Sequence, residues 1–408
     1  MTTTAQLNAI SLFSGCGGDT LGLERAGFKV VAFNEFNKAA AMSHVANFPH
    51  STILVEPKSG ASDITKVPDE VFQPYKGQIN LVFAGFPCQG FSKAGKKSAA
   101  DPRNQMFRQF VRVVKVTEPT FIIGENVSGL LSMKSGPKED DPLVLEIIRK
   151  AFDEIGYSIT YKVLDATDFG VPQQRKRLLI IGWRREVISE FAPESVWASI
   201  SSWGAAQTLP KLSSFVKGSL SNAFELSANA TPLNIDTVAI PVEGDVSGEP
   251  HPYVKLKANA IDQTYNEKTY DRLLSCGKRD SPIHSEIVDL KKPSKTIICT
   301  YDHQPRLLVG MKRADGKAFV RCFTPDELKQ IQGFPADFIL CGNQKEKIVQ
   351  AGNAVPPNLV TAVATTLKGL LVPAALPAPV QPVKMKLKKV AKVAKVAKAT
   401  KVSKEHSS

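Results

Sequence analysis

The sequence predicts an α/β protein with a doubly wound, mostly parallel sheet and a smaller, irregular second domain. Up to residue 185, short apolar runs with strand character alternate with apolar spacing typical of helices, and polar residues directly follow several of the runs. After residue 185 this alternation gives way to Ser-, Asn-, Pro- and Gly-rich sequence in which aromatic residues persist. We therefore predict a first domain over residues 1–185, a second domain over 186–290 and a return to the first over 291–372.

The length and composition are those of a globular protein. The 408 residues, 43% hydrophobic and 22% charged, suffice for one large α/β domain and a smaller one. The six cysteines are scattered without a CxxC pair, so we expect neither a disulfide framework nor a bound metal. The first residues lack the basic-then-apolar pattern of a signal segment, and the longest apolar stretch, residues 359–380, is interrupted by Lys368 and prolines. We expect an intracellular protein that does not enter a membrane.

The formal net charge of +13 is concentrated at the carboxyl end of the chain. Nine lysines minus one glutamate give residues 384–405 a charge of +8, which leaves +5 on the rest. Residues 373–408 combine an Ala/Pro linker with this lysine-rich tail, and we expect them to have no fold of their own. Nucleic-acid binding and simple solvation are both open interpretations of the tail.

The beginning of the chain has a pattern typical of a nucleotide site. Residues 8–13 form a short apolar run, followed by the glycine-rich turn of residues 14–19 and an apolar helical pattern. Such a turn either brings backbone N–H groups close to a ligand or only allows tight packing. A second run, residues 29–35, ends in Glu35, where an acid can accept hydrogen bonds from ribose hydroxyls. A full GxGxxG is missing, so an adenosine ligand without a pyrophosphate fits better.

Two further runs deliver reactive side chains to one edge of the predicted sheet. Residues 79–84 precede the loop Gly85–Ser92, which contains Cys88, and residues 120–123 precede Glu125. The carboxyl ends of parallel strands share an edge, and open α/β sheets bind ligands there. Cys88 is either a nucleophile or an inert buried thiol, and Glu125 is either a catalytic acid or a structural cap.

Local signals predict the remaining elements. A small, basic stretch over residues 92–101 is suited to a loop that closes on a polyanion. The other predictions, in chain order, are a helix opening at Asp101-Pro102, a hairpin-like pair over residues 159–164 and 178–182, a strand at 296–298, a helix capped by Thr324, and an apolar helix after Gly352–Pro357 that ends near Leu371.

Taken in order, these motifs resemble the cytosine-C5 DNA methyltransferase family. The resemblance lies in residues 13–18 (FSGCGG), Glu35, Asp63-Ile64, residues 85–92 (GFPCQGFS), 101–104 (DPRN), 125–127 (ENV), 173–177 (QQRKR), 321–327 with 332–335, and 352–357 (GNAVPP). It implies a Rossmann-like methyltransferase fold over roughly residues 7–371, with residues 186–290 in the position of a target recognition domain. The match is poorest at residues 292–297, and the lysine-rich tail lies outside it.

The resemblance implies a DNA (cytosine-5)-methyltransferase that takes its methyl group from S-adenosylmethionine and acts on a flipped cytosine in double-stranded DNA. Cys88 would add to C6 of the base, and Glu125 would hold the N3/N4 edge and supply a proton near N3. Arg175 and Arg177 would orient the base and neutralise developing charge. Gln173 would support the backbone of the site at the DNA surface.

The same resemblance implies the two binding surfaces residue by residue. In the cofactor site, Glu35 would bind the ribose hydroxyls, Phe36 would pack on the adenine, and Asp63 would recognise the adenine edge. The full set implied for S-adenosylmethionine is Phe13, Gly15, Cys16, Gly18, Glu35, Phe36, Asp63, Ile64, Pro87, Asn353 and Val355. The set implied for DNA is Gln89, Ser92, Lys93, Lys96, Lys97 and Gln173.

Partners and alternatives complete the expectations. We expect a monomer without a metal, with a cognate restriction endonuclease of the same host as a further partner. One alternative is a tRNA cytosine-5 methyltransferase of the same fold. The Cys-Phe-Thr sequence of such enzymes lies in the recognition domain, whereas Cys322–Thr324 lies outside it. The other alternative is a catalytically inactive DNA-binding relative, against which the presence of both Cys88 and Glu125 argues.

Overall fold

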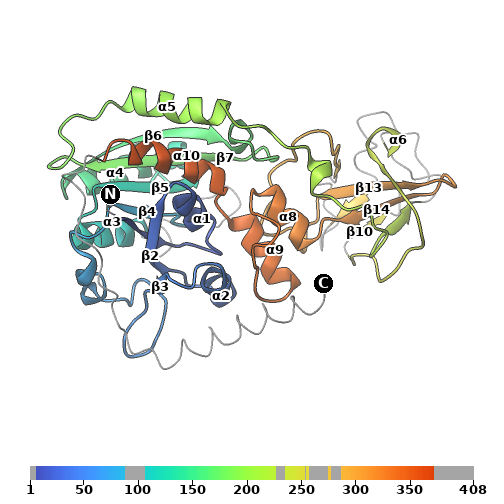
Figure 1. Cartoon of the computed structure of the whole chain (residues 1–408), viewed down its shortest axis with the longest axis horizontal. Helices are drawn as coiled ribbons and strands as arrows, with labels where there is room; N and C mark the ends of the chain where they lie inside the picture. The colour runs from blue at the N-terminus through green and yellow to red at the C-terminus, as the bar shows by residue number, and fades with distance from the viewer. Residues whose placement is uncertain are drawn as a thin grey trace, which may run out of the picture.

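The computed structural model of the chain describes residues 6–87, 106–226, 235–252, 254–256, 274–276 and 286–371. A central sheet, to which this part of the chain contributes seven strands, organises the larger domain (Figure 1). Its strands are β1 (Leu7–Leu12), β2 (Phe28–Asn34), β3 (Thr52–Ile53), β4 (Leu81–Ala84), β5 (Phe121–Val127), β6 (Tyr157–Asp165) and β7 (Lys176–Arg184).

The strand order is β3-β2-β1-β4-β5-β7-β6. The pairs from β3 through β5 are parallel, whereas β7 runs antiparallel to both β5 and β6. The predicted doubly wound, mostly parallel sheet and its hairpin-like final pair are therefore confirmed. Because β1, β4 and β5 are adjacent and parallel, the residues that follow them meet at one edge.

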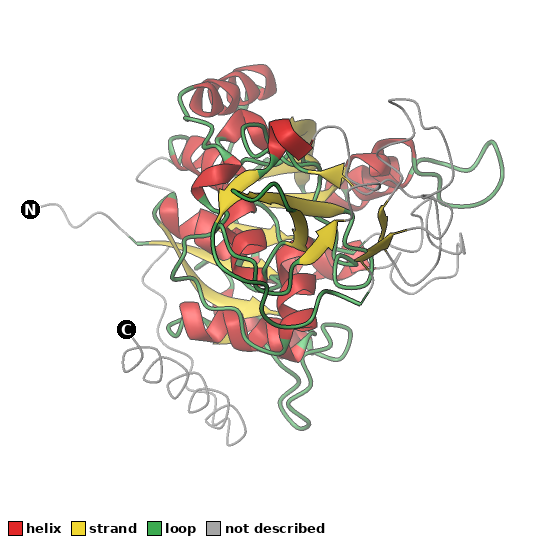
Figure 2. Cartoon of the chain, turned by 90° about the vertical axis from the view of Figure 1, so that its right-hand side faces the viewer, coloured by secondary structure: helices red, strands yellow, loops and turns green. Residues whose placement is uncertain are grey.

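Helices cover both faces of the sheet, as the view turned by 90° shows (Figure 2). One face packs against α3 (Met106–Thr117) and α4 (Val144–Asp153), and the other against α1 (Gly18–Arg25), α5 (Pro193–Ala205) and α10 (Pro357–Lys368). In α3 the buried residues Phe107, Phe110, Val113 and Val114 recur at helical spacing. Each such side chain contributes about 1.5–3 kcal/mol when it is removed from water, which fixes the face that α3 presents to the sheet.

The smaller domain is built around an antiparallel pair, β13 (Leu307–Arg313) and β14 (Ala318–Cys322). The other described strands there are β8 (Phe224–Leu226), β9 (Ile240–Val242), β12 (Glu286–Ile287) and the separate pair β10 (Val254–Leu256) with β11 (Leu274–Cys276). The described helices are α6 (Ile235–Val238), α8 (Pro325–Ile331) and α9 (Gln344–Asn353), the last of which also contacts α2 (Lys38–Asn47). A capping box of Thr324 with Glu327 begins α8, as the sequence predicts.

Two predicted boundaries and one predicted strand are wrong. Helix α5 buries Val196, Trp197 and Ile200 in the core of the larger domain, so that domain extends past residue 185. The core of the smaller domain includes side chains from β13, β14 and α8, so the return to the larger domain does not begin at residue 291. Residues 296–298 form no strand. Among the described helices, none is long and apolar enough to cross a membrane.

Candidate active site

The turn between β1 and α1 closes tightly against Glu35. Phe13, Gly15 and Gly17 all have positive φ angles, of 55°, 55° and 98°, and only glycine adopts this conformation without strain. Glu35 directly follows β2 and accepts a hydrogen bond of 2.8 Å from the backbone N–H of Gly15. It also accepts one of 2.6 Å from the N–H of Asn37. The carboxylate is thus fixed beside the turn, and burial raises its pKa.

Several groups around this turn fit an adenosine ligand. Phe36, next to Glu35, leaves 75% of its surface exposed, which is unusual for a phenylalanine and provides an open aromatic face. The hydroxyl of Ser14 is buried and has no hydrogen-bond partner within the described chain. A Cβ added at Gly15 would meet no described atom within 4 Å, so the turn faces open space. The Cys16 side chain, by contrast, packs with Phe48 and other aromatic residues, so only its backbone belongs to the turn.

Asp63 and Ile64 are held near the end of β2. The Asn34 side chain donates to the carbonyls of Leu54 and Ser62, at 2.9 and 3.0 Å, and so ties their loop to this strand. The Asp63 carboxylate accepts a hydrogen bond of 2.7 Å from the Thr65 hydroxyl and is partly exposed. Ile64 is buried. The structure brings both residues to the same side of the sheet edge as Glu35.

Gly85, at the end of β4, lies where the other parts of the site meet. A Cβ added there would be 3.7 Å from Oε2 of Glu125, 3.7 Å from Cγ2 of Val355 and 3.8 Å from the carbonyl oxygen of Phe13. The glycine-rich turn, the Glu125 carboxylate and the carboxyl-terminal motif therefore converge on one point. Asn353 ends α9 with an exposed side chain, two residues before Val355.

Glu125 and Arg177 form an ion pair at this edge. Strands β5 and β7 pair in a register that sets Val127 opposite Arg177. This places Nε of Arg177 2.9 Å from Oε1 of Glu125, with the two side chains 14% and 12% exposed. Burial raises the pKa of Glu125, and the nearby charges of Arg177 and Arg175 oppose that rise. The carboxyl group is therefore easier to protonate than one in water.

Arg175 does not take the predicted role beside the base. Its guanidinium is buried and donates to the carbonyls of Ile297 at 3.0 Å, Gly352 at 2.9 Å and Ala354 at 3.0 Å. These carbonyls belong to two segments that lie far along the chain. Arg175 therefore holds the carboxyl-terminal motif against the site, and its charge acts on Glu125 from within the core.

Gln173 is likewise wrong as a DNA contact, because its side chain is fully buried. Its Oε1 accepts a hydrogen bond of 3.0 Å from the N–H of Ile297, and its Nε2 donates to Oε1 of Gln332. Gln332 in turn donates to the carbonyls of Ala351 and Ala354, at 3.0 and 2.8 Å. The expected support of the backbone by Gln173 is what the structure contains.

The Cys88 loop begins from a fixed base. The Asn126 side chain donates a hydrogen bond of 3.0 Å to the carbonyl of Phe86, two residues before Cys88. Pro87 is the last described residue before the loop. Cys88 and the expected DNA contacts Gln89, Ser92, Lys93, Lys96 and Lys97 lie outside the described residues, as does the predicted helix start at Asp101-Pro102.

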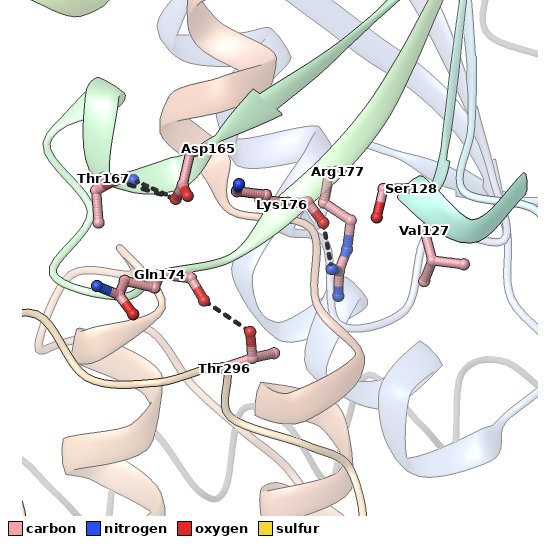
Figure 3. A pocket seen from close by; sticks show the side chains of 8 residues that line it. All are labelled: Val127, Ser128, Asp165, Thr167, Gln174, Lys176, Arg177 and Thr296. Atoms are coloured by element: carbon pink, nitrogen blue, oxygen red, sulfur yellow. Dashed lines mark hydrogen bonds between the residues drawn. The ribbon is translucent and has the colours of Figure 1, made fainter. Parts of the chain in front are cut away.

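A cavity of about 610 Å³ opens beside Arg177, the ion-pair partner of Glu125 (Figure 3). We name it the edge pocket. It is lined by Val127, Ser128, Asp165, Thr167, Gln174, Lys176, Arg177 and Thr296. The hydroxyl of Thr296 donates to the carbonyl of Gln174, at 2.6 Å, and so joins residues of the two domains across the pocket.

Residues 7–369 match the family model described as C-5 cytosine-specific DNA methylase. The chain belongs to this family. It is therefore a cytosine-C5 DNA methyltransferase, as the order of its motifs predicts. The methylase is 32% identical over 364 residues to the Type II methyltransferase M1.HphI of Haemophilus parahaemolyticus, covering 88% of this chain and 86% of that protein. It is 29% identical to the Type II methyltransferase M.NgoPII of Neisseria gonorrhoeae, covering 91% and 98%.

Solved structures share the fold of the methylase. The S. pombe Dnmt2 methyltransferase has a TM-score of 0.59 at 17% identity and covers 90% of this chain and 100% of its own. The Entamoeba histolytica methyltransferase EhMeth has a TM-score of 0.54 at 16% identity and covers 90% and 99%. At these identities the likeness establishes the α/β methyltransferase fold alone.

The sequence missed two residues that shape the site of the methylase. Asn126 stands within the Glu125–Val127 motif, but its hydrogen bond to the Phe86 carbonyl forms only because β4 and β5 are neighbours. Gln332 precedes the Gly-Phe-Pro stretch and reaches back to Gln173 across 159 residues of sequence. Both residues stand in stretches that resemble the family, residues 125–127 and 332–335. The sequence does not reveal their partners, because those come from other parts of the chain.

Proposed function

We propose that this methylase transfers a methyl group from S-adenosylmethionine to C5 of a cytosine flipped out of duplex DNA. The observation that carries the proposal is the ion pair of Glu125 and Arg177, which lie 2.9 Å apart at one edge of the sheet. The neighbouring strand β4 ends at the same edge, and Cys88 follows it in the sequence. A carboxyl group and a guanidinium together suit the polar edge of cytosine. The base has to leave the stack because neither C5 nor C6 is reachable within it.

S-adenosylmethionine supplies an electrophilic methyl group when it is bound. We assign the turn from Phe13 to Gly18 to its methionine and ribose, and Glu35 to the ribose hydroxyls. Phe36, with its exposed ring, is assigned to the adenine face, and Asp63 with Ile64 to the adenine edge. The residues proposed to close the site are Pro87, Asn353 and Val355. The positive φ angles of the turn and the partnerless Ser14 hydroxyl support this assignment.

Cys88 is the proposed nucleophile. Its thiolate forms a bond to C6, the C5–C6 double bond opens, and Glu125 donates a proton at N3 so that the ring stays neutral. C5, now enamine-like, takes the methyl group. Water then takes the C5 proton, the C5–C6 double bond forms again as the C6–S bond breaks, Cys88 leaves as thiolate, and N3 returns its proton to Glu125.

The electrostatics of the described site support this sequence of steps. Burial raises the pKa of Glu125, which favours the protonated form that the first step needs. The guanidinium of Arg177 lies against the same carboxyl group, so it balances the charge when Glu125 is ionised. The proposed general acid and its counter-ion thus lie on adjacent strands.

We infer a role in restriction–modification from the names of the relatives, which are Type II methyltransferases. The substrate is then double-stranded DNA with a specific target sequence, read by the smaller domain, and a cognate endonuclease of the same host is a partner. The methylase is proposed to act as a monomer.

A methyl-transfer assay tests the proposed function. Purified protein with methyl-labelled S-adenosylmethionine should label duplex DNA and leave tRNA unlabelled. Duplexes that contain 5-fluorocytosine should trap a covalent complex, because the C5 fluorine cannot be removed as a proton is. Bisulfite sequencing of co-expressed DNA then identifies the target sequence. Label on tRNA alone, or duplex binding without transfer or trapping, would refute the proposal in favour of one of the two alternatives.

Glu35→Gln should weaken cofactor binding selectively. Hydrogen bonds to a charged group contribute about 1.5–3 kcal/mol, so the dissociation constant of S-adenosylmethionine should rise about 10- to 150-fold. Calorimetry measures the change. The matched control is Glu24→Gln, which alters an acid of α1 that is paired with His50. Equal affinities for both variants would remove Glu35 from the cofactor site.

Truncation after Leu371 should reduce the salt dependence of DNA binding. The removed segment carries the nine tail lysines, and each lysine that neutralises a phosphate contributes about 0.9 to the slope of log K against log salt. Target preference should not change, because phosphate contacts carry no sequence information. An unchanged slope in fluorescence anisotropy titrations would favour a tail that is only solvated.

A further inference from the structure

The edge pocket contains hydrogen-bond donors that no described part of the chain uses. The hydroxyl of Ser128, the side-chain amide of Gln174 and the ammonium of Lys176 all line it, and none has a side-chain partner among the described residues. Figure 3 shows dashed contacts only for the Asp165–Thr167 turn and for the carbonyls of Gln174 and Lys176. Three donors that open into one cavity are suited to a ligand rich in acceptor oxygens.

Asp165 is the one acid among the described residues that line the pocket, and nearby donors already occupy its Oδ1. Oδ1 of Asp165 accepts from the N–H and hydroxyl of Thr167, at 3.3 and 3.0 Å, and from the N–H of Arg175, at 3.2 Å. Arg177 is paired with Glu125, so Lys176 supplies the positive charge that the pocket offers to a ligand. Because Oδ1 of Asp165 is occupied by local donors while the Lys176 ammonium has no described partner, the pocket favours an anion.

Strand geometry places this anion site next to the catalytic pair. Arg177 lines the pocket and also holds Glu125, while Lys176, one residue earlier, is exposed and lies opposite Asp165 in the β6–β7 register. At the start of β7, Arg177 therefore pairs with Glu125, and Lys176 is available to a ligand in the pocket. Any anion bound by Lys176 is a close neighbour of the base held by Glu125.

We propose that the edge pocket binds a backbone phosphodiester of the target DNA strand close to the flipped cytosine. Lys176 is its charged contact, and Ser128 and Gln174 donate hydrogen bonds to the phosphate oxygens. The inference rests on the proposed function, because it takes the duplex as the ligand. Lys176 is a positioning residue: holding the backbone there fixes where the extruded nucleotide enters the site.

Lys176→Gln tests this site. The variant should lose about one unit of salt slope, so that between 50 and 200 mM salt wild-type affinity should fall about threefold more than that of the variant. The loss should be the same on target and non-target duplexes, Lys176→Arg should retain most of the wild-type slope, and S-adenosylmethionine affinity should be unchanged. Lys162→Gln, an exposed lysine of β6 that does not line the pocket, is the matched control.

Duplexes with single neutral methylphosphonate linkages locate the phosphate. One linkage near the target cytosine should weaken wild-type binding several-fold and leave Lys176→Gln unaffected, since the variant has already lost that contact. Additive losses at every linkage, or a variant with the wild-type slope, would overturn the site. If inorganic phosphate at millimolar concentration competes equally well with and without Lys176, the pocket is not the phosphate contact either. Wild-type protein that neither binds nor methylates duplex DNA would instead contradict the proposed function.

Discussion

Cys88→Ser is expected to abolish methyl transfer while S-adenosylmethionine binding stays within about twofold of wild type. A serine hydroxyl is far less acidic than a thiol, so the variant presents almost no anionic nucleophile to C6 at neutral pH. Loss of a covalent nucleophile lowers turnover by several orders of magnitude, and we expect a loss of at least about 10⁴-fold. Single-turnover transfer of labelled methyl groups measures the chemical step directly, without a contribution from product release.

The control for this prediction is Cys322→Ser, which changes a half-buried thiol at the end of β14, in the smaller domain. This variant should retain near-wild-type transfer and still form the covalent complex with 5-fluorocytosine DNA. Cys88→Ser should bind the same duplex without forming the complex. Residual transfer above a few per cent of wild type would mean that another group attacks C6.

Much of the larger domain could be predicted because its signals are local. The run of residues 8–13, the glycine-rich turn and the acid at residue 35 describe a strand, turn and strand without reference to distant residues, and they fold as such. Glu125 could be placed beside Gly85, at the end of β4, because adjacent parallel strands share an edge. The positions of residues that directly follow a strand could therefore be predicted from the sequence.

The position of the Arg175 side chain, by contrast, could not be predicted from local sequence. The resemblance to the family implied a shared role for Arg175 and Arg177, which are two residues apart and would point the same way in a strand. Strand β7 begins only at Lys176, so the alternation does not extend to Arg175, which turns into the interior. Its carbonyl partners come from residues 297, 352 and 354, and no local pattern indicates them.

The strand predicted at residues 296–298 is absent because, here too, the hydrogen-bond partners come from distant parts of the chain. Ile297 and Ile298 are β-branched and apolar, as strand residues are. The N–H of Ile297 instead donates to the side chain of Gln173, and its carbonyl accepts from Arg175. Side chains thus satisfy backbone groups that a neighbouring strand would otherwise pair. The larger domain uses this segment to hold the smaller domain beside the edge pocket.

Glu125→Gln is expected to lower the rate of methyl transfer by about 10²–10⁴-fold, the usual contribution of a general acid. Glutamine keeps the size and can still donate a hydrogen bond to N3, but it cannot transfer a proton. Glu146→Gln, an exposed acid paired with Arg149 on α4, is the control and should leave the rate unchanged. Binding of S-adenosylmethionine should be equal in both variants, which separates a loss of chemistry from a loss of fold.

The pH profile distinguishes a general acid from a merely structural carboxylate. Burial raises the pKa of Glu125, so its protonated form persists to higher pH than in an exposed glutamate and is lost as pH rises through the raised pKa. Transfer by the wild type should therefore decline on that alkaline limb, after correction for the opposing ionisation of the Cys88 thiol, which favours high pH. In Glu125→Gln the limb should disappear and only the rise from thiolate formation should remain. A variant that keeps the same alkaline decline would show that the essential acid is a different group, and Glu125 would then serve only to hold Arg177 in place.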